Sequence, residues 1–160
     1  MEVRKYFKAR LVVKGFAQKK GIDFDEIFSS IFRMTSICIV LSLVAIKDLH
    51  LEKFDIKTNF LRGDLDEEIY MAQPKGFEVK GKENLVCKLK KNLYGLKQAP
   101  RQWYLKFDRF MQERGYNRCH LDYCVYFKRL DDDNYIILCL YVNDMLVVGS
   151  NMDHIKELKH

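Results

Sequence analysis

Two aspartates at predicted strand ends could together hold a divalent cation. Asp55 closes an alternating segment, residues 49–55, and Asp144 lies between two apolar runs, residues 135–142 and 145–149. Carboxylates at the ends of neighbouring strands can meet, and their oxygens are the ligands that magnesium prefers. Two metals held in this way would clamp the attacking and leaving oxygens of a phosphoryl transfer. Taken singly, each residue also fits an ordinary strand-end or turn aspartate.

The elements that must position these aspartates can be predicted from apolar periodicity and turn residues. Strands are expected at residues 8–14, 49–55, 67–71, 85–89, 123–128, 135–142 and 145–149. Asn143 and Asp144 are two polar residues between two apolar runs, which predicts a tight hairpin turn. Strands interleaved with two long helices predict an α+β domain with a mainly antiparallel sheet.

The helices have recognisable starts and ends. Thr35 is expected to cap an apolar helix that runs to about Asp48. A second helix is expected between Pro100, which a first helical turn tolerates, and Gly115, where a helix can end. A last helix begins near Met152. Four residues of the second helix recur at helical spacing and are predicted to face the core: Trp103, Phe107, Phe110 and Met111.

Composition excludes a disordered chain and favours an anionic partner. Of the 160 residues, 48% are hydrophobic and 13% aromatic, with only two prolines, as in a single globular domain. The net charge of +6 is uneven, because residues 1–22 carry seven basic and one acidic side chain and residues 80–118 carry eleven and three. A basic surface beside an acidic one suits a polyanion together with a separate carboxylate site.

Cysteine usage and the missing targeting signals indicate an intracellular protein. The five cysteines form no Cys-x-x-Cys pair, and Cys38 and Cys139 lie in apolar runs, where a thiol usually behaves as a small buried hydrophobe. No apolar signal core follows the basic start of the chain. The longest apolar run, residues 37–46, falls far short of the roughly 20 residues that a membrane span needs. We therefore expect no membrane association.

Three short patterns resemble known binding loops but fail in detail. Residues 76–82 have phosphate-loop spacing, yet Glu83 stands where a Ser or Thr should bind magnesium. Residues 14–17 match half of an RNA-recognition signature, whose aromatic second half is absent. The acidic run that begins at Asp64 starts like a calcium loop but has Ile69 where the turn needs glycine. The histidines show no metal-ligand spacing.

Six segments follow one another in a recognisable order and spacing. They are Lys8 to Phe16, Phe54 to Gly63, Glu68 to Met71, Leu93 to Tyr104, Cys124 to Phe127 and Tyr141 to Asp144. In this order they resemble the reverse transcriptase region of a copia-type LTR retrotransposon Pol polyprotein, over nearly the whole chain.

The resemblance implies a fold and a domain layout. The fold would be a polymerase palm, an antiparallel sheet backed by two helices, with part of the fingers. The chain would be one partial domain, with residues 1–35 and 60–95 fingers-like and residues 36–59 and 96–160 in the palm. It would be an internal piece of Pol, lacking the ribonuclease H and integrase portions.

The resemblance also assigns roles to individual residues. Asp55, Asp144 and the Ile56 carbonyl would hold two Mg²⁺ ions. Phe60 matches the bulky residue that excludes a ribose 2′-hydroxyl by steric clash. The remaining nucleotide-binding positions are two near the triphosphate, Lys8 and Arg10, and three along the nucleotide and template, Tyr94, Gly95 and Lys97.

Asn143 departs from the family motif Tyr-Xaa-Asp-Asp, in which the first aspartate of the pair binds metal most directly. An amide oxygen is a much weaker magnesium ligand than a carboxylate, so we expect impaired nucleotidyl transfer. Asn tolerates the left-handed conformation of tight hairpins, so we expect the fold to be kept. The catalytic residues by resemblance are therefore Asp55, Asn143 and Asp144.

The expected partners are an RNA template, a DNA primer, deoxynucleoside triphosphates and the rest of the polyprotein. The expected location is intracellular and cytoplasmic, within virus-like particles as in the family. Two alternatives stay open: a catalytically dead remnant that only binds nucleic acid, and a pseudogene product with no role. The structural alternative is a stand-alone RNA-recognition module, which lacks support because its paired aromatic signatures are absent.

Overall fold

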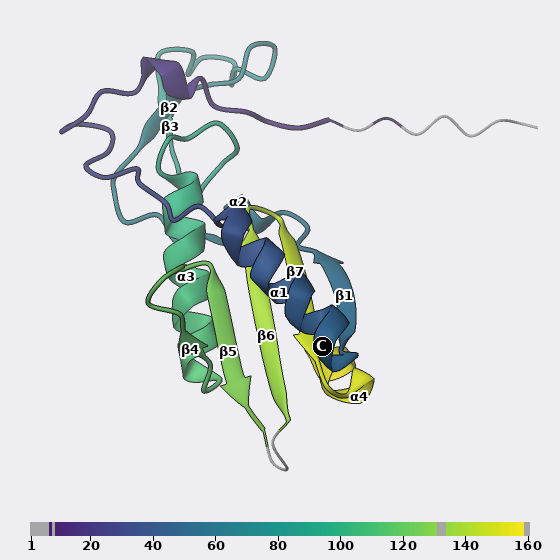
Figure 1. Ribbon diagram of the computed structural model, residues 1–160. Helices are drawn as coiled ribbons and strands as arrows, with labels where there is room; N and C mark the ends of the chain where they lie inside the picture. Colours follow the sequence, from purple (N-terminus) through teal and green to yellow (C-terminus); the bar gives the residue numbers. More distant parts are fainter. Residues whose placement is uncertain (1–6, 8, 131–133, 159–160) are drawn as a thin grey trace, which may run out of the picture.

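The structure, a computed structural model, describes residue 7, residues 9–130 and residues 134–158, with the backbone alone at Asn59. The helices are α1 (Met34–Lys47), α2 (Asn59–Arg62), α3 (Ala99–Glu113) and α4 (Met152–Glu157), with a short 3-10 turn at Gly15–Ala17. The strands are β1 (His50–Asp55), β2 (Tyr70–Ala72), β3 (Val86–Lys88), β4 (Asn117–Arg118), β5 (Val125–Arg129), β6 (Tyr135–Tyr141) and β7 (Asp144–Gly149). Figure 1 shows their arrangement.

One five-stranded antiparallel sheet organises the chain. Its strand order is β1-β7-β6-β5-β4, and β2 and β3 form a separate two-stranded sheet. The last strand of the hairpin, β7, therefore lies between β6 and β1, which comes from far earlier in the chain. The predicted α+β class with an antiparallel sheet is confirmed, and this topology brings the ends of β1 and β7 together.

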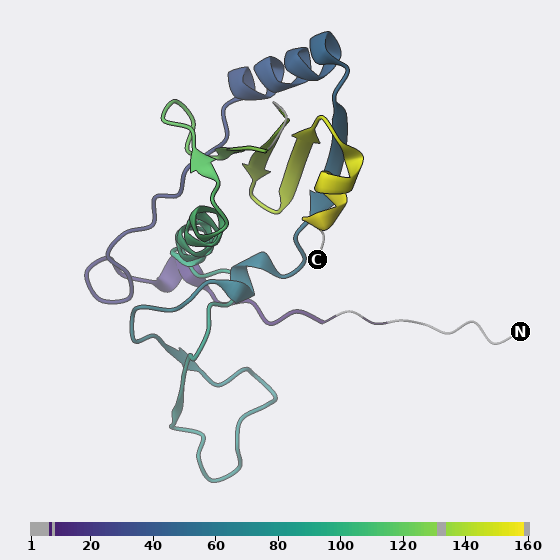
Figure 2. The ribbon, with the colours of Figure 1, turned by 90° about the horizontal axis from the view of Figure 1, so that it is seen from below.

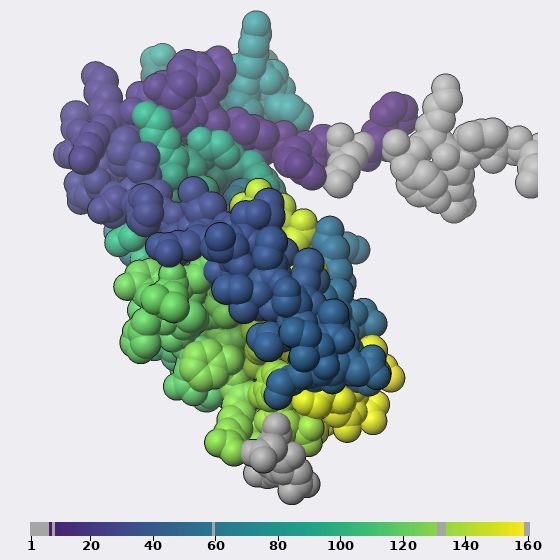
Figure 3. Space-filling view, viewed as in Figure 1, coloured from purple at the N-terminus to yellow at the C-terminus, as the bar shows by residue number. Residues whose placement is uncertain are grey.

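The two long helices cover opposite faces of this sheet. The Lys47 ammonium of α1 lies 5.9 Å from the ring centroid of Tyr135, and the Phe107 ring of α3 lies 5.6 Å from that of Tyr126. Tyr126 pairs with Leu138, which is three positions from Tyr135 on β6 and so faces the other side. Figure 2 shows α1 and α3 on the two sides of the sheet, and Figure 3 shows α1 covering the nearer face.

Helix α3 buries a continuous stripe against the sheet. Trp103, Phe107 and Met111 are buried, as predicted. The prediction for Phe110 is wrong, since its side chain is 45% exposed and the Arg114 guanidinium lies 3.6 Å from its ring centroid. The buried stripe is centred on the side of α3 that carries Phe107 and Met111, so Phe110 falls at its edge.

Helix α1 is capped from a distant loop and not by Thr35, which lies inside the helix. One carboxylate oxygen of Asp122 accepts hydrogen bonds from the Arg33 N–H at 3.0 Å and from the Ser36 hydroxyl at 2.6 Å. The other oxygen accepts from the Cys124 N–H at 3.0 Å. This carboxylate, only 5% exposed, therefore joins the start of α1 to the start of β5.

The strand predicted at residues 8–14 is wrong for its described part. Val12 forms one isolated bridge with Tyr94, where the Val13 N–H donates to the Tyr94 carbonyl at 2.7 Å. Gly95, with a φ of +95°, then turns the partner segment away, so no ladder continues.

Within the described part of the chain, none of the helices combines the length and apolar character that crossing a membrane requires.

Candidate functional site

Asp55 and Asp144 meet across neighbouring strands. Asp55 ends β1, Asp144 begins β7, and the two residues are direct partners in the antiparallel register. Directly opposed residues of an antiparallel pair project to the same face, with Cβ atoms about 4.5–5.5 Å apart. The structure therefore brings together the two carboxylates that the strand pattern indicated.

The hairpin turn lies one residue earlier than predicted. Tyr141 pairs with Asp144, so the two turn residues are Val142 and Asn143, and Asp144 belongs to the strand. The left-handed φ falls on Val142, at +54°, and not on Asn143. Asp144 cannot be a turn residue, because it is paired with Tyr141 of β6 on one side and with Asp55 of β1 on the other.

The backbone of this turn is tied to the end of β1. The Ile56 N–H donates to the Asn143 carbonyl at 2.8 Å, one residue beyond the Asp55–Asp144 pair. Positive φ is a strained conformation for the β-branched Val142, and such strain persists only where the surrounding structure holds it. The turn therefore presents Asn143 and Asp144 from a constrained backbone.

A lysine shares the face of the two aspartates. The Lys53 ammonium lies 3.1 Å from a carboxylate oxygen of Asp144, and the two side chains are 62% and 42% exposed. Lys53 is two residues before Asp55 on β1, so strand alternation puts both on one face. That alternation is a sequence signal, and it could have identified Lys53 as a site residue. The local set of Asp55, Asp144 and Lys53 carries a formal charge of −1.

The oxygen atoms of Asp55 and Asp144 are ligands of the kind that a hard cation binds, but they are few. Within residues 9–130 and 134–158, no group of three or more His, Cys, Asp or Glu side chains lies together in a way that could hold a metal ion. Two carboxylates on one face are nevertheless oxygen ligands of the type that magnesium takes, and the Asn143 amide adds a weak third oxygen on the adjacent turn. The described residues therefore offer a divalent cation two charged oxygen ligands at this point, from Asp55 and Asp144, and no group of three.

Three of the residues expected to contact a nucleotide gather around the Tyr94 ring. Phe60, on α2, makes an edge contact with the Tyr94 ring, with centroids 5.7 Å apart. The Arg10 guanidinium lies 5.1 Å from the same Tyr94 ring centroid. Lys8, expected in the same role as Arg10, lies outside the described residues. Three segments distant in sequence thus meet at one aromatic ring.

Two glycines allow the backbones of these segments to touch. A Cβ added to Gly95 would lie 2.1 Å from the Val13 carbonyl oxygen, and one added to Gly15 would lie 1.9 Å from the Gly95 carbonyl oxygen. Any side chain at either position would therefore clash with main-chain atoms. Gly15, which the sequence placed only at the end of a strand, is required for this contact.

Lys97 is engaged with a neighbouring loop. Its ammonium donates to the Gln18 carbonyl at 3.1 Å and lies 5.0 Å from the Phe24 ring centroid, while its N–H donates to the Gln18 side-chain oxygen at 2.8 Å. In this arrangement Lys97 holds residues 18–24 against the start of α3.

A basic hollow lies beside α2 and away from the aspartate pair. It is lined by residues 61–65 together with lysines from two other segments: Lys90, Lys91 and Lys106. The Lys106 ammonium is 2.7 Å from a carboxylate oxygen of Asp64, the residue at which the calcium-loop pattern began. The acidic run therefore acts here as a partner for lysine.

Comparison with protein families gives one match over the full length. The family model described as reverse transcriptase (RNA-dependent DNA polymerase) matches residues 1–160. No solved structure matches this chain.

Several curated proteins are similar to the chain over most of its length. The chain is 64% identical over 153 residues to a retrovirus-related Pol polyprotein from transposon TNT 1-94 of Nicotiana tabacum, covering 96% of the chain and 12% of that protein. It is 38% identical over 145 residues to a retrovirus-related Pol polyprotein from transposon RE1 of Arabidopsis thaliana, covering 91% and 10%. A Gag-Pol polyprotein of transposon Ty1-BL from Saccharomyces cerevisiae is 27% identical over 152 residues, covering 94% and 8%. The chain thus spans about a tenth of the length of these relatives.

Proposed function

The chain belongs to the reverse transcriptase (RNA-dependent DNA polymerase) family of copia-type Pol polyproteins, and from this we propose that it forms the catalytic part of an RNA-directed DNA polymerase. In this proposal residues 36–59 and 96–160 form the palm and residues 1–35 and 60–95 belong to the fingers. The assignment is supported by the five-stranded sheet, whose central hairpin carries the Tyr141–Asp144 motif.

The observation that carries the proposal is the direct pairing of Asp55 with Asp144. These carboxylates would hold Mg²⁺, with the main-chain carbonyl of Ile56 beside them. The metal would supply electrostatic stabilisation of the phosphate oxygens during phosphodiester formation. The chain's own contribution is to fix the two carboxylates on one sheet face, through a register shared by β1, β6 and β7.

Nucleotide selection would fall to the aromatic cluster beside this pair. The Phe60 ring, held edge-on by Tyr94, presents a bulky wall that would exclude a 2′-hydroxyl and so favour deoxynucleotides. Arg10, stacked against the same ring, would direct its guanidinium to the triphosphate, with Lys8 in a similar role. Gly95 and Lys97 would line the nucleotide and the template.

Asn143 would weaken this chemistry without disturbing the hairpin. Its backbone carbonyl accepts the Ile56 N–H, a bond that any residue at this position can make. Its side chain lacks the charge of the family's aspartate, and the Lys53 ammonium further reduces the negative charge of the site. We therefore propose a polymerase whose activity in this copy is impaired.

The substrates would be an RNA template, a DNA primer and deoxynucleoside triphosphates, within a longer Pol polyprotein. Since the chain spans about a tenth of its relatives, these partners would contact additional parts of the polyprotein as well. The proposed location is the cytoplasm, in virus-like particles.

Primer extension on a primed RNA template, with Mg²⁺ and deoxynucleotides, tests the proposal. We expect weak extension by the 160-residue chain and at least about tenfold more by Asn143→Asp, because losing even a residue that only supports a metal ligand typically costs about 10–100-fold. The Asp55→Asn, Asn143→Asp double variant is the negative control. If Asn143→Asp gives no product while its circular dichroism matches that of the unchanged chain, the catalytic proposal is wrong.

A second candidate, a remnant that only binds nucleic acid, is favoured by the basic hollow with Lys90, Lys91 and Lys106. Binding to an RNA–DNA hybrid should weaken steeply with salt, because phosphate contacts release counterions. Lys90→Gln with Lys91→Gln should lower the affinity, while Lys47→Gln, at the far end of α1, should not. Hybrid binding no tighter than that of a charge-matched unrelated protein would exclude this function.

A further inference from the structure

Two glutamines from distant segments form a hydrogen-bonded pair close to the residues expected to bind the nucleotide. The Gln18 side-chain N–H donates to the Gln98 side-chain oxygen at 3.1 Å, and the Gln98 side-chain N–H donates to the Asp23 carbonyl at 2.9 Å. Gln98 is 0% exposed and comes directly before α3. The amide group of Gln98 therefore has a partner for its N–H and a partner for its oxygen, and both partners lie within residues 18–23.

Gln18 completes the contact with its own side-chain oxygen and its main chain. The side-chain oxygen accepts the Lys97 N–H at 2.8 Å, and the Gln18 carbonyl accepts from the Lys97 ammonium at 3.1 Å. In both glutamines the side-chain N–H donates and the side-chain oxygen accepts. A buried network of this kind stabilises one arrangement of its segments, because another arrangement would leave a donor or an acceptor unpaired.

The pair lies at the end of a side-by-side alignment of residues 10–18 with residues 94–98. In this alignment Val12 and Tyr94 form one isolated β-bridge. Even a complete two-stranded hairpin is only marginally stable in water, so one bridge is too weak to fix two segments against each other. The glutamine pair supplies hydrogen bonds where the ladder is missing, and it thereby holds residues 10–18 against the start of α3.

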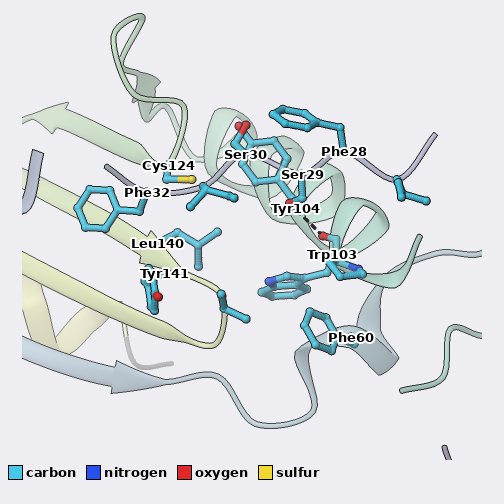
Figure 4. Close-up of a pocket in the computed structure, with 14 residues that line it drawn as sticks. Phe28, Ser29, Ser30, Phe32, Phe60, Trp103, Tyr104, Cys124, Leu140 and Tyr141 are labelled. Atoms are coloured by element: carbon cyan, nitrogen blue, oxygen red, sulfur yellow. Dashed lines mark hydrogen bonds between the residues drawn. The ribbon is translucent and has the colours of Figure 1, made fainter. Parts of the chain in front are cut away.

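The start of α3 is itself packed against α2, close to the expected nucleotide-binding residues. Trp103 of α3 and Phe60 of α2 line one apolar pocket, as Figure 4 shows. The Phe60 ring contacts the Tyr94 ring, and the Arg10 guanidinium lies over the same Tyr94 ring. A shift of residues 10–18 relative to α3 would therefore displace the Arg10 guanidinium from this ring.

We propose that Gln98 is a positioning residue for the nucleotide: with Gln18 it holds residues 10–18 in place, and so directs the Arg10 guanidinium to the triphosphate. The inference rests on the proposed polymerase function, in which Arg10 binds the triphosphate. Gln98 is buried and makes its contacts with protein groups, so it acts through Arg10. Its loss should weaken nucleotide binding and leave the chemical step unchanged.

Hydrogen exchange tests the contact without any activity assay. Gln98→Met keeps the length of the side chain but removes both of its hydrogen bonds. Mass spectrometry of peptides covering residues 12–24 should show exchange at least about tenfold faster than in the unchanged chain, the effect of two neutral hydrogen bonds. Peptides from β6 should exchange at the same rate in both proteins. Unchanged exchange at residues 12–24 would overturn the proposal.

Nucleotide kinetics test the positioning role in the Asn143→Asp background. There, Gln98→Met should raise the KM for deoxynucleotide by about tenfold or more and change kcat by less than about twofold, because only the binding contact of Arg10 is weakened. Asp122→Asn, which loosens the cap of α1, is the control for general destabilisation and should leave this KM unchanged. An unchanged KM in Gln98→Met, or an equal rise in Asp122→Asn, would overturn the proposal.

A second variant removes the same pair from its half-buried side. Gln18→Met should raise the KM by a similar factor, and the Gln18→Met, Gln98→Met double variant should raise it no further than the larger single effect, since both act through one contact. Multiplied effects would overturn the pairing. If Gln98→Met fails to fold, Gln18→Met still decides. An inactive Asn143→Asp chain would contradict the proposed function, and the exchange rates would still decide whether Gln98 holds residues 10–18.

Discussion

Asp55, the last residue of β1, is paired directly with Asp144, the first residue of β7. The pairing joins two segments that are far apart in sequence, and it places the side chains of Asp55, which is exposed, and of Asp144, which is 42% exposed, on one face. Like charges directly opposite each other on a sheet are destabilising, and here the Lys53 ammonium, 3.1 Å from Asp144, is the counter-charge that the structure supplies. Such an arrangement favours the binding of a cation.

Divalent-cation binding should depend on this pair in a graded way. We expect Asp55→Asn to weaken Mn²⁺ binding at least about tenfold, since it removes one of two carboxylate ligands, and Asn143→Asp to strengthen it by a similar factor. Isothermal titration calorimetry of the free chain measures both without any activity assay. Asp66→Asn, on an exposed loop, should leave the affinity unchanged, and an equal loss there would mean that binding is non-specific.

Lys53 should compete with a bound cation. Replacing it by Gln removes an ammonium that contacts Asp144, and we expect about two- to fivefold tighter Mn²⁺ binding. The effect is modest because ion pairs between exposed side chains contribute only about 0.2–1 kcal/mol. Lys80→Gln, an exposed lysine of the β2–β3 loop, is the matched control for net charge. Unchanged affinity in Lys53→Gln would show that the ammonium leaves the carboxylates when metal binds.

The features that could be predicted from sequence are those that depend on local pattern. Apolar alternation placed β1, two apolar runs on either side of a polar turn placed β6 and β7, and helical spacing placed α3, because these signals need only a few consecutive residues. The Asp55–Asp144 pair followed from these, since strand ends meet once the hairpin packs on β1. The same alternation could also have identified Lys53 as a residue on the face of the two aspartates.

The features that were missed depend on contacts between distant segments. The cap of α1 comes from Asp122, which is 89 residues from Arg33, so it gives no local signal. The turn lies one residue earlier than expected because β7 must pair on both sides. Residues 8–14 look like a strand in the sequence, although in the described part of this segment only Val12 forms a bridge, with Tyr94.

Asp122 should stabilise the fold more than a loop aspartate usually does, because it accepts three hydrogen bonds. The two carboxylate oxygens of Asp122 accept three hydrogen bonds, whereas an asparagine has one oxygen and one NH₂ group. In Asp122→Asn the NH₂ group must therefore face at least one N–H or O–H donor. We expect the free energy of unfolding to fall by about 2 kcal/mol. Urea denaturation followed by circular dichroism measures the loss. Asp25→Asn, an exposed carboxylate, should change the free energy of unfolding by less than about 0.5 kcal/mol. If Asp122→Asn and Asp25→Asn changed the free energy of unfolding equally, Asp122 would not act as the cap of α1.

The buried thiols should make the fold sensitive to alkaline pH. Burial, with a further contribution from Asp122, raises the pKa of Cys124 and Cys139 to about 12, above the ordinary value of about 8.5. A raised pKa in the folded state means that the unfolded chain loses these protons first. The stabilisation is therefore complete below about pH 8.5 and is lost as the pH rises towards 12.

Two measurements follow from those thiols. The burial expected for Cys38 from its apolar run is wrong, since this thiol is exposed, whereas that expected for Cys139 is confirmed. At pH 8, iodoacetamide should therefore modify Cys38 quickly and leave Cys124 and Cys139 unmodified until urea unfolds the chain. The urea midpoint should fall between pH 8 and pH 10.5, and the fall should be smaller in Cys124→Ala, which has one fewer thiol to ionise. Rapid labelling of Cys139 in the folded chain would contradict its burial.

Gly95 and Gly81 offer a matched test of the backbone contact beside the residues proposed to bind the nucleotide. Both have positive φ, +95° and +79°, but a Cβ on Gly95 would lie 2.1 Å from the Val13 carbonyl oxygen, whereas one on Gly81 would meet nothing within 4 Å. Gly81→Ala should therefore lower the free energy of unfolding by about 1 kcal/mol, for the left-handed conformation alone. Gly95→Ala should lower it by about 3 kcal/mol or more, because the backbones of two segments must also separate. Urea denaturation compares the two variants, and equal losses would mean that the contact between residues 13 and 95 adds nothing to the stability of this region.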